Sequence, residues 1–110
     1  MSIQWDDFEK VDMRAGTVVD VQPFEKAKKP AWKLWIDFGP LGIKKSSAQI
    51  KTLYSAEALL GRQVIAVVNF PPKQIADFMS ECLVLGVYNE QQEVVLLNPD
   101  KSVGNGCRVG

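Results

Sequence analysis

The chain is 110 residues long, 46% hydrophobic and 24% charged, and its 13 basic and 13 acidic side chains give a formal net charge of zero. It contains no histidine and no Cys-x-x-Cys pair, which excludes the usual zinc sites and Cys/His nucleophile arrangements. It also lacks the glycine-rich loops that cradle a nucleotide, so the sequence predicts a binding protein without a cofactor rather than an enzyme.

The length predicts one domain, residues 1–110, with a core of its own. No stretch approaches the roughly 20 apolar residues of a membrane-spanning helix, and the first residues lack the basic and apolar regions of an export signal. We therefore expect a cytoplasmic protein without membrane insertion. In that reducing compartment, Cys82 and Cys107 are expected to be buried free thiols.

The neutral total conceals an uneven distribution of charge along the chain. Residues 26–51 contain seven lysines and one acid, a net charge of +6, while the segments on either side are acidic. A fold that places this segment on one surface would attract an anionic polymer through its phosphates. The alternative is that these lysines only keep strands and hairpins soluble.

The chain begins with the pattern of a short helix and then of a strand. Trp5, Phe8 and Val11 recur at three-residue spacing between charged residues, which indicates a short amphipathic helix. Residues 14–24 are rich in β-branched side chains and end at a proline, which predicts the first strand.

Two further strands are predicted after a lysine-rich connection. Residues 31–38 alternate with the period of two that is typical of a half-buried strand. A turn at 39–42 leads into a third strand over residues 43–50. In the second strand, one predicted face holds Lys33, Trp35 and Asp37, and the core-facing side holds Trp32, Leu34, Ile36 and Phe38.

A short helix and a buried strand follow. Residues 55–61 predict one or two helical turns, because Ser55 can cap the first amides and Gly61 suits a left-handed exit. The apolar run within residues 63–69 predicts a buried strand that stops at two prolines.

The last third of the chain predicts shorter strands. Residues 79–88 are expected to form a single strand with Cys82, Val84 and Gly86 facing the interior. A turn then leads into a strand at 94–97, and residues 107–109 are expected to make a last pairing.

This order of elements predicts an all-β fold. It is typical of a five-stranded OB-fold barrel with a short helix between strands 3 and 4, plus a short N-terminal helix and C-terminal strand extensions. Other small barrels and sandwiches produce a similar order of elements, so periodicity alone does not exclude those folds.

Trp35 and the lysines near it form the first candidate binding feature. An aromatic ring beside Lys33 on an exposed strand face can stack a base while the lysine neutralises a phosphate. A lid over one end of the barrel or a subunit contact would explain Trp35 equally well. Lys44 and Lys45 point to opposite faces of their strand, so at most one lies inside, and we expect an edge region that is open on both sides and leaves room for a phosphate. A lysine-protected edge strand is the alternative.

The loop after the buried strand forms the second candidate feature. Phe70, Pro71, Phe78 and Met79 would give an apolar surface. Lys73 and Gln74 would border it. Apolar groups concentrated in a loop indicate a peptide-accepting cleft, and a dimer seam or ordinary core is the alternative.

Several motifs along the chain resemble the tRNA-binding domain family, whose barrels occur alone or appended to some aminoacyl-tRNA synthetases. They are residues 12–18 (DMRAGTV), 53–54 (LY), 60–64 (LGRQV), 67–69 (VVN), 80–83 (SECL) and 94–97 (VVLL). Within that family, three longer segments resemble the CsaA-type chaperones: residues 33–39 (KLWIDFG), 44–50 (KKSSAQI) and 69–75 (NFPPKQI).

The resemblance implies an OB-fold homodimer in the cytoplasm. It implies an ATP-independent, export-related chaperone that binds unfolded or preprotein chains. Its alternative is a tRNA-binding protein or structure-specific tRNA cofactor whose basic patch is the primary site. A third reading is a dimeric adaptor with neither activity.

Two departures from the family bear on tRNA binding. This chain has Ala48-Gln49 where the appended domains usually carry a Ser-Gly pair, and few cations follow Lys73. The candidate tRNA-binding residues are Lys28, Lys29, Lys33, Trp35, Lys44, Lys45, Lys51 and Lys73. The candidate peptide-binding residues are Phe70, Pro71, Lys73, Gln74, Phe78 and Met79.

Overall fold

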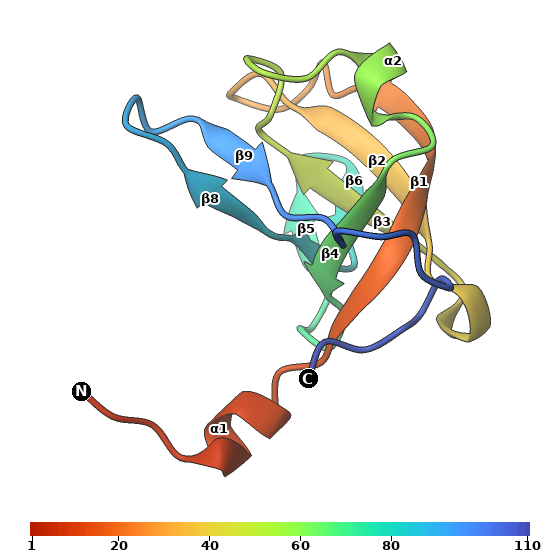
Figure 1. Cartoon of the computed structure of the whole chain (residues 1–110). Coiled ribbons are helices and arrows are strands. Elements are labelled where there is room, and N and C mark those ends of the chain that lie inside the picture. Colours follow the sequence, from red (N-terminus) through yellow and green to blue (C-terminus); the bar gives the residue numbers. More distant parts are fainter.

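The structure is a computed structural model that describes residues 1–110, and strands dominate it (Figure 1). Its elements in chain order are α1 (Trp5–Glu9), β1 (Met13–Pro23), β2 (Trp32–Asp37), the 3-10 helix η1 (Gly39–Leu41), β3 (Ile43–Ala48), α2 (Ala56–Leu59), β4 (Gln63–Val67), β5 (Lys73–Ile75), β6 (Phe78–Ser80), β7 (Leu83–Val84), β8 (Gly86–Tyr88) and β9 (Val94–Leu96). The predicted all-β fold, with a short helix between the third and fourth strands, is confirmed.

Five strands form one antiparallel sheet in the order β3-β2-β1-β4-β7, curled into a nearly closed barrel (Figure 1). The long strand β1 pairs with β4 over its first half and with β2 over its second, and its register shifts between Val18 and Asp20. Such a bulge increases the local bend, which lets one strand serve both halves of a barrel. This is the five-stranded OB fold that the order of elements predicts.

The remaining opening lies between β3 and β7, and the residues after β6 bridge it. The backbone N–H of Lys45 donates to the Glu81 carboxylate at 2.9 Å, and the Glu81 N–H donates to the Lys45 carbonyl at 2.7 Å. The middle of the β3 edge is therefore covered by this segment, rather than open on both sides as predicted.

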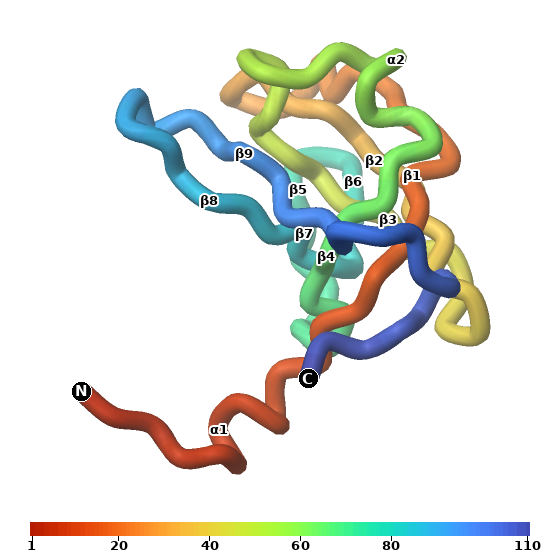
Figure 2. Tube along the Cα trace, viewed as in Figure 1, coloured from red at the N-terminus to blue at the C-terminus, as the bar shows by residue number.

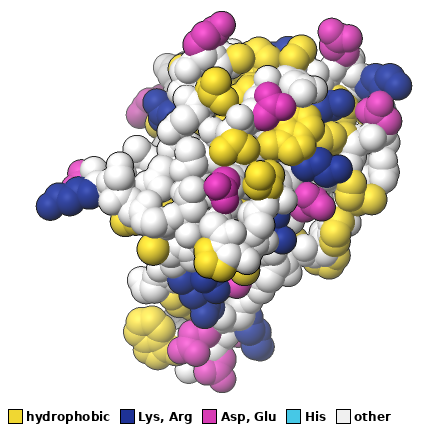
Figure 3. Space-filling model, turned by 90° about the vertical axis from the view of Figure 1, so that its right-hand side faces the viewer, with side chains coloured by type: hydrophobic (Ala, Val, Ile, Leu, Met, Phe, Trp, Pro, Cys, Tyr) yellow, Lys and Arg dark blue, Asp and Glu magenta, His cyan; other side chains and the backbone are white.

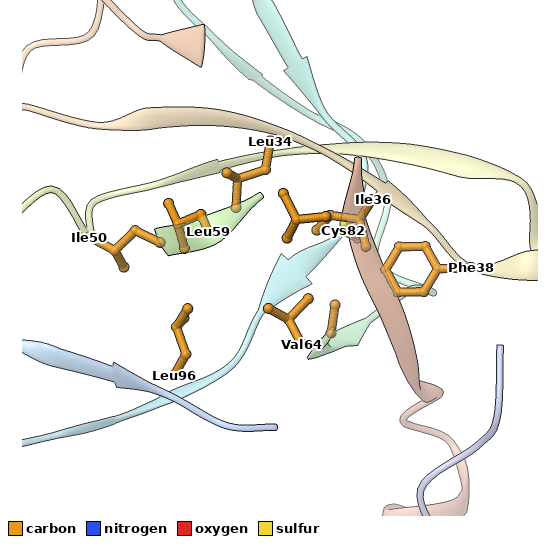
Figure 4. Close-up of a cluster of buried hydrophobic side chains, with 10 residues drawn as sticks. Leu34, Ile36, Phe38, Ile50, Leu59, Val64, Cys82 and Leu96 are labelled. Atoms are coloured by element: carbon orange, nitrogen blue, oxygen red, sulfur yellow. The ribbon is translucent and has the colours of Figure 1, made fainter. Parts of the chain in front are cut away.

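The core is a cluster of apolar side chains inside the barrel, drawn from β1, β2, β4, α2 and the later strands (Figure 4). Leu34, Ile36 and Phe38 have no exposed surface, which confirms the predicted alternation of β2. Gly16 lies where β1 crosses these side chains: a Cβ there would come within 2.7 Å of Ile36 and of the Phe38 ring. Only glycine therefore allows this close approach.

The predicted helix between the third and fourth strands is present as α2. The Ser55 hydroxyl accepts a hydrogen bond from the Ala58 N–H at 3.1 Å, and Gly61 leaves the helix with a φ of 84°. Leu59 is fully buried and anchors α2 over the end of the barrel.

Residues 79–88 do not form the single strand that their composition predicts. They are divided among three strands with three different partners: β6 pairs with β5, β7 with β4 and β8 with β9. The β5–β6 hairpin, which turns through Ala76 at a φ of 51°, was not predicted. Gly86 is exposed rather than interior, whereas Cys82 is buried as expected.

The C-terminal segment returns to the start of β1, while the N-terminus lies apart from it beyond α1 (Figure 2). The Val109 N–H donates to the Met13 carbonyl at 2.9 Å and the Ala15 N–H to the Cys107 carbonyl at 2.9 Å, which confirms the predicted last pairing. Cys107 itself is exposed, so the prediction that both thiols are buried is wrong for this residue.

The helix α1 projects away from the barrel, and Trp5 on it is 78% exposed (Figure 2). None of the helices is long and apolar enough to cross a membrane.

Candidate functional site

The outer face of β2 and β3 carries three of the predicted tRNA-binding residues side by side. Trp35 lies opposite Lys45 in the strand register, and Lys33 lies opposite Ser47 two residues away. Because alternate residues share a face, these four side chains point away from the barrel core. The β5–β6 hairpin lies over this face, and its Ile75 and Phe78 pack there in a second, smaller apolar cluster.

Phe78 is the centre of this second cluster and is only 5% exposed. Its ring meets the rings of Phe24 and Trp35 edge to face, with centroid distances of 5.4 and 5.8 Å. The prediction that Phe78 belongs to an exposed apolar surface is therefore wrong. Its ring also covers part of Trp35, which is half-buried and leaves less of its surface for a stacked base.

Two lysines lie over the aromatic rings of this cluster. The Lys33 ammonium is 5.0 Å from the centroid of Phe24 and 5.2 Å from that of Phe78, and the Lys45 ammonium is 5.3 Å from Phe78. These are cation–π distances, and the two lysines still keep partial access to solvent. Both cations are thus fixed by the fold at the rim of the second cluster.

The other predicted cations lie elsewhere. Lys44 is on the opposite face of β3, near Cys82. Burial raises the pKa of the Cys82 thiol, and the positive charge of Lys44 partly offsets that rise. Lys51 lies 4.5 Å from the ring of Trp32, which is half-buried. The eight predicted tRNA-binding residues therefore do not form one continuous patch.

Lys28 and Lys29 line a cavity of about 410 Å³ between the β1–β2 loop and the β5–β6 turn. Neither makes an ion pair, whereas Lys26 beside them binds Asp77 at 3.1 Å. That contact lowers the pKa of the Asp77 carboxyl. The two unpaired ammonium groups are free to bind an anion.

The proline-containing loop borders a second cavity of about 380 Å³. Phe70, Pro71 and Lys73 line it, together with Ile75 and residues 80–83. Phe70 is 55% exposed, so a large apolar side chain stands at the mouth of this cavity. The structure brings these three predicted peptide-binding residues together.

Gln74 and Met79 are not part of that cavity. They face each other across the β5–β6 hairpin, and their neighbours Ile75 and Phe78 point to the barrel side. Since side chains alternate along a strand, Gln74 and Met79 lie on the solvent side of the hairpin. The side-chain amide of Gln74 donates to the Ala76 carbonyl at 2.7 Å and so braces the turn.

A third cavity, of about 480 Å³, lies between the end of β3 and the β8–β9 hairpin, and it was not predicted from the sequence. Its apolar wall includes Ile50, Val84, Val94 and Leu96, and Tyr88 stands at its rim. The cavity was missed because the composition of residues 79–88 predicts one continuous strand. In the structure this segment is divided, and β8 and β9 extend away from the barrel as a separate hairpin.

Cys82 is the one buried cysteine of the structure. Burial raises the pKa of the Cys82 thiol to about 12, so this thiol stays protonated and unreactive at neutral pH. The cysteine, aspartate and glutamate side chains nowhere gather in a group that could hold a metal ion. The site is thus built from apolar cavities and fixed cations.

The surface charge is mixed on the face shown in Figure 3. Hydrophobic side chains gather in the upper part of that face, with basic and acidic side chains among them. At the lower end, where Figure 1 places α1, hydrophobic atoms lie beside acidic ones. No single sign of charge covers this face.

Comparison with known proteins decides the family. The model described as "Putative tRNA binding domain" matches residues 13–108. The chain belongs to the tRNA-binding domain family. It is 33% identical to the methionine–tRNA ligase of Methanococcoides burtonii and 37% identical to that of Nanoarchaeum equitans, each over 94% of this chain. It spans only 15% and 13% of the length of those two ligases.

Solved structures of this family cover the whole chain. The chaperone CsaA of Bacillus anthracis is 48% identical, with a TM-score of 0.95 and complete coverage of both chains. The CsaA chaperone protein of Picrophilus torridus is also 48% identical, with a TM-score of 0.93 over 99% of this chain and 100% of that one. A MetRS related protein of Pyrococcus horikoshii is 28% identical with a TM-score of 0.89, covering 100% of this chain and 99% of that one. The resemblance to CsaA-type members of the family is confirmed.

Proposed function

We propose that this protein is an ATP-independent, export-related chaperone that binds unfolded or preprotein chains in the cytoplasm. The observation that carries the proposal is the full-length likeness, at 48% identity, to two proteins described as CsaA chaperones. The match to ligases supports a shared domain rather than their catalytic activity, because it spans so little of their length.

The arrangement of the cavities is suited to such a ligand. An unfolded chain presents apolar side chains, and Phe70 and Leu83 offer exposed apolar surface at the cavity of about 380 Å³. Lys73 borders the same cavity without an ion pair. A chaperone that only holds its client works by mass action, since binding lowers the free concentration of the aggregation-prone chain.

The chaperone proposal is tested by light scattering of a chemically unfolded client diluted into buffer with this protein. Phe70→Ser should largely abolish the suppression of aggregation while the fold is retained. Leu60→Ser is the matched control, because Leu60 is 57% exposed at the end of α2 and lines none of the described cavities. Full suppression by the folded Phe70→Ser protein would reject this site.

We also propose that the protein is a homodimer. The support is the exposed apolar surface of Ile3 and Trp5 at the N-terminal helix, and of Val87 and Val95, which are partners in the β8–β9 hairpin. Two copies of the site on one dimer would allow bivalent capture of a client. Sedimentation at several concentrations should give twice the monomer mass, and Trp5→Glu should shift it to the monomer; a monomeric parent would reject the dimer.

A second candidate function is tRNA binding, which the family match favours. If about five phosphates are contacted, log affinity should fall against log salt with a slope of about −3.5 to −4.5, a roughly 100- to 500-fold loss from 50 to 200 mM. Lys28→Glu should flatten the slope more than the single control Lys44→Glu, because Lys28 lines the basic cavity, whereas Lys44 lies on the face of β3 opposite to Ser47, which also lines that cavity. A slope near zero for the parent would reject a phosphate site.

A further inference from the structure

The outer edge of β3 has backbone groups without good partners. The N–H and carbonyl of Lys45 point away from β2, since both bond to Glu81. In an antiparallel pair this direction recurs at every second residue, so the backbone groups of Ser47 also point outward. The Ser47 N–H reaches only the Ser80 hydroxyl at 3.4 Å, and the Gln49 N–H has no hydrogen-bond partner.

The Ser47 carbonyl is similarly available. Its only contact is with the hydroxyl of the neighbouring Ser46, at 3.5 Å, which is the limit of a hydrogen bond. Two donors and one acceptor thus stand along the edge of β3 beyond the point that Glu81 covers. Open edges of this kind are templates for an added strand.

The same edge lies where the three cavities meet. Ser47 and Ile75 line the cavities of about 480, 380 and 410 Å³. Gln49 lines the cavity of about 480 Å³ and the basic cavity of about 410 Å³ that contains Lys28 and Lys29. The cavities therefore form one surface around the open edge. On one side this surface presents Leu83, and on the other the unpaired Lys28 and Lys29.

We propose that an extended polypeptide segment binds by adding a strand to β3 at residues 47–49. Its backbone would pair with Ser47 and Gln49, its apolar side chains would contact Ile75 and Leu83, and acidic residues next to them would approach the lysines of the basic cavity. The inference rests on the proposed chaperone function and specifies how that site recognises its ligand. Backbone pairing is largely independent of sequence, which suits a protein that binds many unfolded chains.

The chemistry of the edge favours a polypeptide over a nucleic acid. A peptide backbone alternates donors and acceptors and can satisfy both the amides and the carbonyl of the edge. A phosphodiester can accept from the amides but has no donor for the Ser47 carbonyl, so a nucleic acid would have to bring a base N–H or a 2′-hydroxyl to that position as well. The positive charge of Lys28 and Lys29 selects acidic residues at one end of the segment.

The test uses a nine-residue peptide with alternating valine and threonine in its centre and two aspartates at one end, made in both chain orders. Its affinity for the full chain is measured by fluorescence anisotropy, and the tighter order is then methylated at one backbone nitrogen at a time. Methylation of the central residue whose N–H pairs with the Ser47 carbonyl should weaken binding by about fivefold, and methylation of the residues on either side of it, whose N–H groups point away from the edge, should have little effect. Equal effects at all positions, or none, would overturn the strand addition.

A pair of protein variants tests the same edge from the other side. Gln49→Pro removes the N–H donor, and Gln49→Ala keeps it, so only the proline variant should lose affinity, by about fivefold. Suppression of client aggregation is measured with the same parent preparation. Suppression without this dependence on position in the methylation series rejects the strand addition alone, whereas absence of suppression rejects the proposed function as well.

Discussion

Truncation of Phe78 tests whether this residue stabilises the fold around the site or contacts a bound ligand. Its sequence position predicts an exposed apolar contact, but in the structure its ring is buried against Phe24 and Trp35. Lys33 and Lys45 also lie over it. Truncation to alanine should therefore destabilise the whole hairpin-covered face of the barrel.

The expected size of the effect follows from this burial. Truncation of a buried phenylalanine to alanine costs about 3–5 kcal/mol, depending on how far the site can collapse. The second cluster holds only three buried residues and lies near the surface, so we expect a loss near the lower end, about 3 kcal/mol. For a domain of this size, that corresponds to a fall in Tm of roughly 13 °C.

The assay is urea and thermal unfolding of Phe78→Ala beside Phe70→Ala. Phe70 is more than half exposed, so its variant should change the free energy of unfolding by no more than about 0.5 kcal/mol while losing client binding. The opposite pattern would refute the reasoning: a Phe78→Ala protein that loses under about 1 kcal/mol and yet fails to bind clients would place Phe78 at the ligand.

Two further predictions concern titratable groups. In the native protein a thiol reagent at pH 8 should react rapidly with the exposed Cys107 and slowly with Cys82, whose pKa burial raises to about 12; rapid reaction of both would contradict this burial. The hydrogen bond from Arg14, at 2.6 Å, lowers the pKa of Asp12 from 3.8, so the carboxylate stabilises the fold above that value and the effect is lost as pH falls through the lowered pKa. Urea midpoints should show Asp12→Asn less stable than the parent at pH 7, with the difference shrinking as pH falls below 3.8 through the lowered pKa of Asp12; a difference that keeps its full size in acid would refute this assignment.

Local patterns predicted the elements whose structure depends on near neighbours. The alternation of β2 was correct because one of its faces is buried, so Leu34, Ile36 and Phe38 had to share a side. The helix α2 was correct because its signals, the cap at Ser55 and the exit at Gly61, act within one turn. The position of Phe70 in a proline-stiffened loop likewise indicated a solvent-facing site.

The errors arose where distant segments compete for a partner. Residues 79–88 have the composition of one strand, but their backbone groups find partners in β5, β4 and β9 in turn. Cys107 was predicted to be buried as a small apolar residue. In the structure its backbone carbonyl pairs with Ala15 near the start of β1, and its thiol is exposed.

By itself, the sequence determined the class of the fold, the order of its elements and the cations available to a ligand, because periodicity, capping and charge are local properties of the chain. Only the tertiary structure decided that Phe78 is buried, that Glu81 covers the β3 edge at Lys45, and that three cavities meet at the open part of that edge. The physical reason is that burial, cavity shape and unsatisfied backbone groups depend on which remote strands pack together. No local pattern carries that information.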